Sequence, residues 1–158
     1  MPLNPWIANS FLDSCAFDPK YDPEDKAAIE VFRLHEHDGL PILLAHSTQK
    51  ETEHPNTPPW VKIKAAELIY TIAVSLTPNE TSRLRAIRDV LSGKGLSKNV
   101  EQDARHIFEA QKYGSYFVTT DGRLLQRAET IRTLCTVEIL LPSDFLERVH
   151  RYRRQAEH

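Results

Sequence analysis

The chain lacks the features that define several large classes of protein. It has only two cysteines in 158 residues, too few for a disulfide framework. Its 20 Lys and Arg are balanced by 22 Asp and Glu, so it does not attract polyanions through overall charge. Its apolar runs, such as residues 40–45, are far shorter than the ~20 residues of a membrane-spanning helix. We therefore expect a cytoplasmic protein with no membrane segment, and no leader in residues 1–9.

Glycine-based nucleotide motifs and paired metal ligands are also missing. Gly93, Lys94 and Gly95 lack the spacing and the Lys-Ser/Thr ending of a P-loop, and no dinucleotide-binding glycine pattern occurs. His46 and His54 do not have the paired spacing of a zinc site. The sequence shows no internal repeat. A nucleotide-binding loop and a zinc site are therefore not predicted.

The composition that remains is typical of a globular protein, with 41% hydrophobic and 27% charged residues. The length suits a single domain, which we assign to residues 1–150. Residues 151–158 are predicted as a basic, frayed tail.

Expected strands alternate with expected helices along the chain. Apolar and β-branched runs predict strands at 7–12, 40–45, 69–76, 116–119 and 136–141, with helix as the alternative for 69–76. Helical spacing and capping residues predict helices at 23–38, from 47 or 48, at 60–68, from 78 to near 93, at 100–113, at 123–133 and from 142. This alternation is typical of an α/β fold, in three αβα layers around a mainly parallel sheet.

Four acidic residues are placed where such a fold brings side chains together. Asp13 and Asp121 each follow a predicted strand, Glu51 lies early in the helix after the second strand, and Asp103 lies in the first turn of the 100–113 helix. Ligands of open parallel sheets bind beyond the carboxyl ends of the strands. Two carboxylates about 4 Å apart repel by roughly 4 kcal/mol at an effective dielectric near 20, so such a cluster favours a bound divalent cation. Oxygen ligands suit Mg²⁺ or Mn²⁺, which can activate water against a phosphodiester.

Each acid also has a simpler interpretation. Glu51 completes a capping box with Thr48, and Asp103 is a first-turn acid of the kind that the helix dipole favours. Glu53 competes with Glu51 for the same role. Cys15 is an alternative nucleophile or an inert thiol.

The four acids lie in four blocks of the sequence: Ile7-Ala8-Asn9-Ser10-Phe11-Leu12-Asp13, Thr48-Gln49-Lys50-Glu51, Asp103-Ala104-Arg105-His106-Ile107 with Ala110, and Phe117-Val118-Thr119-Thr120-Asp121. These blocks resemble the signature blocks of PIN-domain nucleases, in the same order. The resemblance implies a Rossmann-like parallel sheet and a Mg²⁺- or Mn²⁺-dependent endoribonuclease acting on single-stranded or structured RNA. It also implies a homodimer and, for many small members, a toxin that an antitoxin protein opposes.

The resemblance also implies roles for particular residues. Asp13, Glu51, Asp103 and Asp121 would bind the metal, and the hydroxyl of Thr119 would steady the last acid. Position 123, where some members carry a further acid, is Arg123 here. His106, one turn after Asp103, is either a metal ligand or a packing or substrate-contact residue.

Two other functions remain open. One is a catalytically idle PIN-like module that binds RNA or protein, because prolines interrupt the helix after Glu51. The other is a phosphotransfer or phosphatase domain, against which the missing second acid after Asp13 argues.

The charges are distributed unevenly along the chain. Residues 1–79 carry 6 basic and 11 acidic side chains, and residues 80–158 carry 14 basic and 11 acidic ones. The basic candidates for a phosphate-contacting face are Arg83, Arg85, Arg88, Lys94, Lys98 and Arg105.

Overall fold

The sheet at the centre of the molecule is parallel throughout. The computed structural model describes residues 3–17, 19–44, 59–68, 75–92 and 100–156. In these residues four strands pair in the order β2-β1-β3-β4, all in parallel. The strands are β1 (Ser10–Leu12), β2 (Ile42–Leu43), β3 (Tyr116–Val118) and β4 (Glu138–Leu140). The predicted α/β class and parallel sheet are confirmed.

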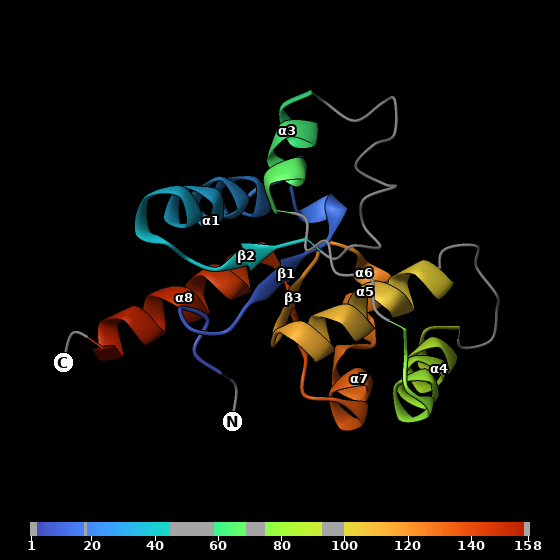
Figure 1. The fold of residues 1–158 in the computed structure, drawn as a ribbon. Coiled ribbons are helices and arrows are strands. Elements are labelled where there is room, and N and C mark those ends of the chain that lie inside the picture. Colours follow the sequence, from blue (N-terminus) through green and yellow to red (C-terminus); the bar gives the residue numbers. More distant parts are fainter. Residues whose placement is uncertain (1–2, 18, 45–58, 69–74, 93–99, 157–158) are drawn as a thin grey trace.

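Helices connect these strands and cover both faces of the sheet (Figure 1). A short 3₁₀ helix, η1 (Ser14–Ala16), follows β1. The α-helices are α1 (Glu24–Asp38), α3 (Pro59–Leu68), α4 (Pro78–Ser92), α5 (Val100–Tyr113), α6 (Gly122–Gln126), α7 (Ala128–Leu134) and α8 (Pro142–Ala156). Within the described residues no helix has the length and apolar character needed to cross a bilayer.

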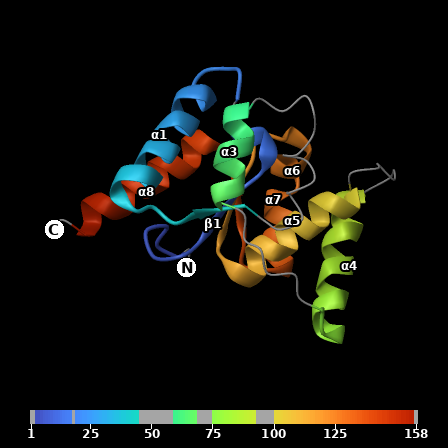
Figure 2. The ribbon, with the colours of Figure 1, turned by 45° about the horizontal axis from the view of Figure 1, so that its top comes forward.

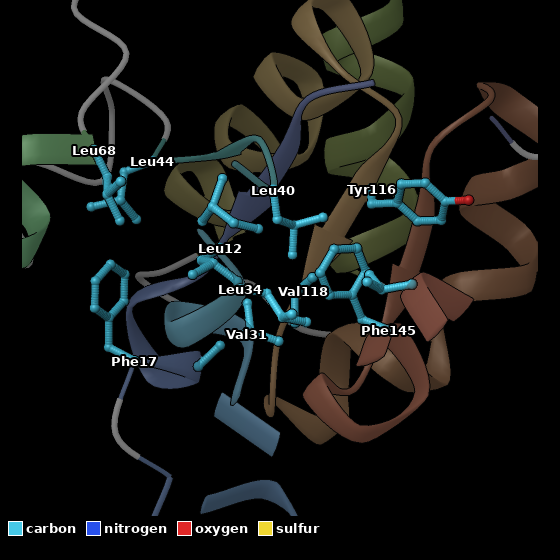
Figure 3. Packing of buried hydrophobic residues seen from close by; sticks show 13 residues of the cluster. Leu12, Phe17, Val31, Leu34, Leu40, Leu44, Leu68, Tyr116, Val118 and Phe145 are labelled. Atoms are coloured by element: carbon cyan, nitrogen blue, oxygen red, sulfur yellow. The ribbon is translucent and has the colours of Figure 1, made fainter. Parts of the chain in front are cut away.

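Side chains alternate between the two faces of the sheet and build two separate cores. Phe11 and Phe117 pair across β1 and β3 and belong to the cluster that includes α4, α5 and α7. Leu12 and Val118, one residue further along, belong to the opposite cluster with Phe145 of α8 (Figure 3). The sheet therefore lies between two helical layers.

The neighbouring strands β1 and β3 send their connections to opposite faces. The connection after β1 leads into α1, whose Val31 and Leu34 pack in one cluster. The connection after β3 leads into α6 and α7, whose Leu124 and Ile131 pack in the other. Such a reversal opens a crevice at the carboxyl ends of the two strands, the usual ligand site in open parallel sheets. The fold thus places a candidate site between the ends of β1 and β3.

Local capping signals fix several helix boundaries as predicted. At the start of α4 the Thr77 N–H donates to a Glu80 carboxylate oxygen at 3.0 Å, and the Glu80 N–H donates to the Thr77 hydroxyl at 3.2 Å. This is the reciprocal capping box expected from the sequence. Helix α1 ends before Gly39, whose φ of 77° is left-handed, and α5 spans the predicted residues.

Several predicted elements differ from the structure. Of the strand predicted at 40–45, the structure has β2 at Ile42–Leu43, while residues 40–41 are in no strand and residue 45 is not described. The strand predicted at 7–12 begins only at Ser10, because Ile7 lies in a turn in which its N–H donates to the Asn4 carbonyl, and its surface is 81% exposed. The single helix predicted at 123–133 is two helices, α6 and α7. The chain departs from helical geometry at Arg127, with φ −98° and ψ 0°, and the Arg127 N–H bonds the Leu124 carbonyl three residues back.

The C-terminal residues 151–156, predicted as a separate tail, continue helix α8 instead. Arg153 explains part of this order. Its guanidinium stacks 4.6 Å from the centre of the Trp6 ring and donates to the Asp38 carboxylate at 3.0 Å. The basic end of the chain is thus attached to α1 and to the N-terminal turn.

Two predicted elements fall mainly outside the described residues. The predicted helix from 47 or 48 lies outside them. Of the predicted strand 69–76, only residues 75–76 are described, and they are in no strand.

Gly114 lies where α5 meets β3, in close contact with the segment before β1. A Cβ at this position would lie 2.4 Å from the Asn9 carbonyl oxygen and 3.0 Å from Cε2 of Phe11. That carbonyl also accepts the Ser115 N–H at 3.0 Å, so it is held in place. Gly114→Ala should lower the free energy of unfolding by about 1–3 kcal/mol, measured by denaturant titration. Gly122→Ala is the control, because its Cβ meets nothing within 4 Å; equal losses in the two variants would contradict the argument.

Candidate functional site

Three of the four predicted acids converge at the carboxyl ends of β1 and β3. Asp13 follows β1 directly and is buried, and Asp121 follows β3 and caps the N-terminus of α6. Asp103 reaches the same place from the first turn of α5, where its carboxyl group interacts with the charges of both Asp13 and Asp121. Glu51, and its competitor Glu53, lie outside the described residues.

The hydroxyl of Thr119 connects the first acid to the last. It donates to Oδ2 of Asp13 at 2.8 Å and accepts the Asp121 N–H at 3.0 Å. Thr119 is fully buried at the end of β3, and its own N–H donates to the Leu140 carbonyl of β4. The hydroxyl therefore orients the Asp13 carboxylate and the backbone that carries Asp121.

Cys15 is part of this hydrogen-bond network. Its Sγ donates to Oδ2 of Asp13 at 3.4 Å and lies 3.3 Å from the Thr119 hydroxyl. Burial of the sulfur, together with the negative charge of Asp13, raises the pKa of Cys15 to about 11. At neutral pH the side chain is thus a protonated thiol, and the thiolate that a nucleophile requires is scarce.

The electrostatics of the site are most visible at Asp103. Burial of its carboxyl group, and then the negative charge of Asp13, raise the pKa of Asp103 from 3.8 to about 6. His106 opposes this shift, Asp121 adds to it, and Arg123 opposes it. Carboxylates that crowd one another in this way gain stability from a proton or a cation. The burial of Asp103 and the nearby charge of Asp13 therefore make a proton or a cation favourable at this carboxyl group.

His106 is fully buried against the site. Its Nδ1 lies 3.9 Å from Oδ1 of Asp13, and among the described residues neither ring nitrogen has a hydrogen-bond partner. Buried polar groups without a partner cost about 1–3 kcal/mol and are rare in folded proteins. The imidazole thus belongs to the acidic site, where a polar ligand would give it a partner.

Arg123 is a member of the site that the sequence did not reveal. Its guanidinium lies 3.1 Å from Oδ2 of Asp121 and 3.9 Å from Oδ2 of Asp103. The sequence alone shows only that position 123 is not acidic. The pairing with Asp103 depends on how α5 packs beside α6, which no local signal specifies.

The donors of the site fit a hard divalent cation. The carboxylates of Asp13, Asp103 and Asp121 supply oxygen ligands, which Mg²⁺ and Mn²⁺ prefer. In the described part of the chain, however, no three His, Cys, Asp or Glu side chains are grouped closely enough to hold one ion as they stand. Binding therefore requires the carboxylates to shift, and Glu51 stays the predicted fourth ligand.

The predicted basic face is only partly assembled. Arg83 and Arg85 are exposed on α4, and Arg105 is exposed on α5. Arg88 lies 3.6 Å from the Glu101 carboxylate, which offsets its charge. Lys94 and Lys98 lie outside the described residues. A cavity of about 190 Å³ is lined in part by Asp103, Arg123 and Arg127.

Comparison with models of known protein families and with curated protein sequences finds no match for this chain. The interpretation of the site therefore depends on its geometry and on the motifs in its own sequence.

Proposed function

We propose that the protein is a PIN-like, metal-dependent endoribonuclease that hydrolyses phosphodiesters of single-stranded RNA. The observation that carries the proposal is the convergence of Asp13, Asp103 and Asp121. These residues come from three separate sequence blocks and meet at the reversal point of a parallel sheet. A structural cap or a solvated acid does not require partners of like charge, whereas a cation site does.

The chemistry follows from what each group can do. A bound Mg²⁺ or Mn²⁺ ion supplies an activated water and stabilises the negative charge of the phosphodiester. Asp13, Asp103 and Asp121, with Glu51 as the predicted fourth acid, would hold the ion. Thr119 keeps the Asp13 carboxylate oriented through its 2.8 Å hydrogen bond, and such supporting hydrogen bonds are worth about 10–100-fold in metal affinity or activity.

The test is cleavage of a single-stranded RNA by the purified protein with Mn²⁺ and with excess chelator. We expect cleavage that the chelator abolishes, and a rate about 100-fold lower in Asp121→Asn. Asp38→Asn is the matched control. Asp38 lies at the end of α1, at the opposite edge of the sheet, and its ion pair with Arg153 is on the surface. Cleavage that survives the chelator or the Asp121→Asn substitution would refute the proposal.

A second candidate function is an idle PIN-like module that binds RNA or protein without cleaving. The ion pairs of Arg123 favour it, because they partly neutralise Asp103 and Asp121 without a metal. Calorimetric titration separates the two functions. Binding of Mn²⁺ that Asp103→Asn removes supports the nuclease, and no binding supports the idle module.

The partners and the location stay predictions from the sequence. These are an antitoxin protein, a homodimer, and the cytoplasm, with which the free thiols of Cys15 and Cys135 agree. A cavity of about 360 Å³ between α1 and α3 is lined by apolar side chains that include Ile29 and Trp60, and by three charged ones, Asp25, Arg33 and Glu36. The two helices lie side by side in Figure 2, and Ile29 is 70% exposed. Among the described surfaces, this one best suits a protein partner.

A further inference from the structure

Arg123 provides a positive charge to the acidic site from within the chain. Its Nη2 atom lies 3.1 Å from Oδ2 of Asp121, and its Nε atom lies 3.4 Å from Oδ1 of the same residue. The same Nη2 atom lies 3.9 Å from Oδ2 of Asp103. The guanidinium thus bridges two carboxylates that come from different helices.

The bridge uses the oxygen atoms that a metal ion would need. Oδ1 of Asp121 is already occupied by the Arg123 N–H at 2.9 Å, in the N-cap of α6. Oδ2 of Asp121 and Oδ2 of Asp103 are the atoms nearest the guanidinium. Among the described residues no three metal-binding side chains are grouped to hold one ion, and two of the three acids face Arg123.

The pairing is also weak enough to be exchanged. The Arg123 side chain is 61% exposed, whereas those of Asp103 and Asp121 are 14% and 23% exposed. An ion pair with one well-solvated partner contributes little to stability, so the guanidinium can leave at little cost. Helix α5 and the cap of α6 hold the backbone that carries the two acids, so only their side chains have to shift toward an ion.

We propose that the Arg123 guanidinium is a built-in counter-cation of the acidic site, which a divalent metal ion must displace from Asp121 and Asp103 in order to bind. The proposal rests on the metal site of the proposed function and adds a competitor from the protein itself. Its consequence is a lower affinity for the metal than the carboxylates alone would give. Arg123 is thus a residue that tunes occupancy of the site, without being a ligand.

The experiment is titration of the metal-free protein with Mn²⁺ by calorimetry, with free Mn²⁺ followed independently by electron paramagnetic resonance. Arg123→Gln removes the charge and the fork of donors but keeps a polar side chain. We expect it to bind Mn²⁺ about three- to tenfold more tightly than the unaltered protein. Arg127→Gln is the matched control, because Arg127 lines the same cavity and forms no ion pair with the described carboxylates. Its affinity should stay within about twofold.

The outcomes separate this proposal from the proposed function. If the unaltered protein binds Mn²⁺ and Asp103→Asn does not, the metal site stands, and an Arg123→Gln affinity that is unchanged or weaker overturns only the role of Arg123. An equal gain in Mn²⁺ affinity in Arg123→Gln and Arg127→Gln also overturns it. The loss of one positive charge near the site would then explain the gain without any displacement of Arg123. If only Arg123→Gln binds Mn²⁺, the proposal is supported, because Arg123 then blocks the site completely in the unaltered protein. If neither protein binds Mn²⁺, both proposals fail.

Discussion

Replacing Asp13 with asparagine is expected to lower the rate of RNA cleavage by about 1,000-fold while leaving the fold intact. The side chain of Asp13 is 8% exposed and contacts three other residues of the site. It accepts from Thr119 and Cys15 and lies 3.9 Å from Nδ1 of His106. A loss of about 1,000-fold corresponds to about 4 kcal/mol of barrier, which is the scale of a lost metal ligand.

Asparagine keeps the shape of the side chain, so the network around it can reform. The Thr119 hydroxyl can still donate to the amide oxygen, and only the charge disappears. Single-turnover cleavage with saturating Mn²⁺ gives the rate, and circular dichroism with thermal unfolding tests the fold. Asp38→Asn should cleave like the unaltered protein. An Asp13→Asn protein that keeps more than about a tenth of the rate would show that Asp13 is not a metal ligand.

The parts of the structure that depend on neighbouring residues were predictable from the sequence. The start of α4 follows from the reciprocal bonds of Thr77 and Glu80, which lie three residues apart. The places of Asp13 and Asp121 follow from the strands that precede them, and a parallel sheet brings the ends of those strands to one edge. The positions of the acids at strand ends and helix starts therefore predict the acidic site.

The parts that depend on tertiary packing were not predictable. Nothing near Ile7 in the sequence shows that the Ile7 N–H donates to the Asn4 carbonyl. This turn makes the strand begin only at Ser10. The bridge from Arg123 to Asp103 joins residues 20 positions apart and requires α5 and α6 to meet. The position of the His106 ring, whose nitrogens bond to none of the described residues, likewise emerges only after the fold closes around it. Glu51 lies outside the described residues, so the fourth acid stays a prediction.

Asp103→Asn is expected to abolish Mn²⁺ binding and cleavage and yet to stabilise the metal-free protein. Folding raises the pKa of Asp103 from 3.8 to about 6, chiefly through burial and then through the charge of Asp13. Below the unfolded pKa the group is protonated in both states and has no effect on stability. As the pH rises from 3.8 to 6, the unfolded chain releases its proton while the folded protein retains it, so stability falls; above 6 the full cost applies. Asparagine carries no charge and removes that cost.

The expected gain is about 1–2 kcal/mol near neutral pH, after allowance for solvent screening, or roughly 2–8 °C in Tm. Thermal unfolding in chelator at about pH 7.5 and about pH 5 measures it, and the gain should be smaller at the lower pH. With Mn²⁺ at about 100 times its Kd, the unaltered protein should become the more stable of the two. Binding adds about 2.7 kcal/mol to its free energy of unfolding and nothing to that of Asp103→Asn. Asp38→Asn should show neither the gain nor the reversal. A metal-free Asp103→Asn protein that is less stable at about pH 7.5 would mean that the Asp103 carboxylate is stabilised by its surroundings, and the crowding of charge that underlies the metal site would be absent.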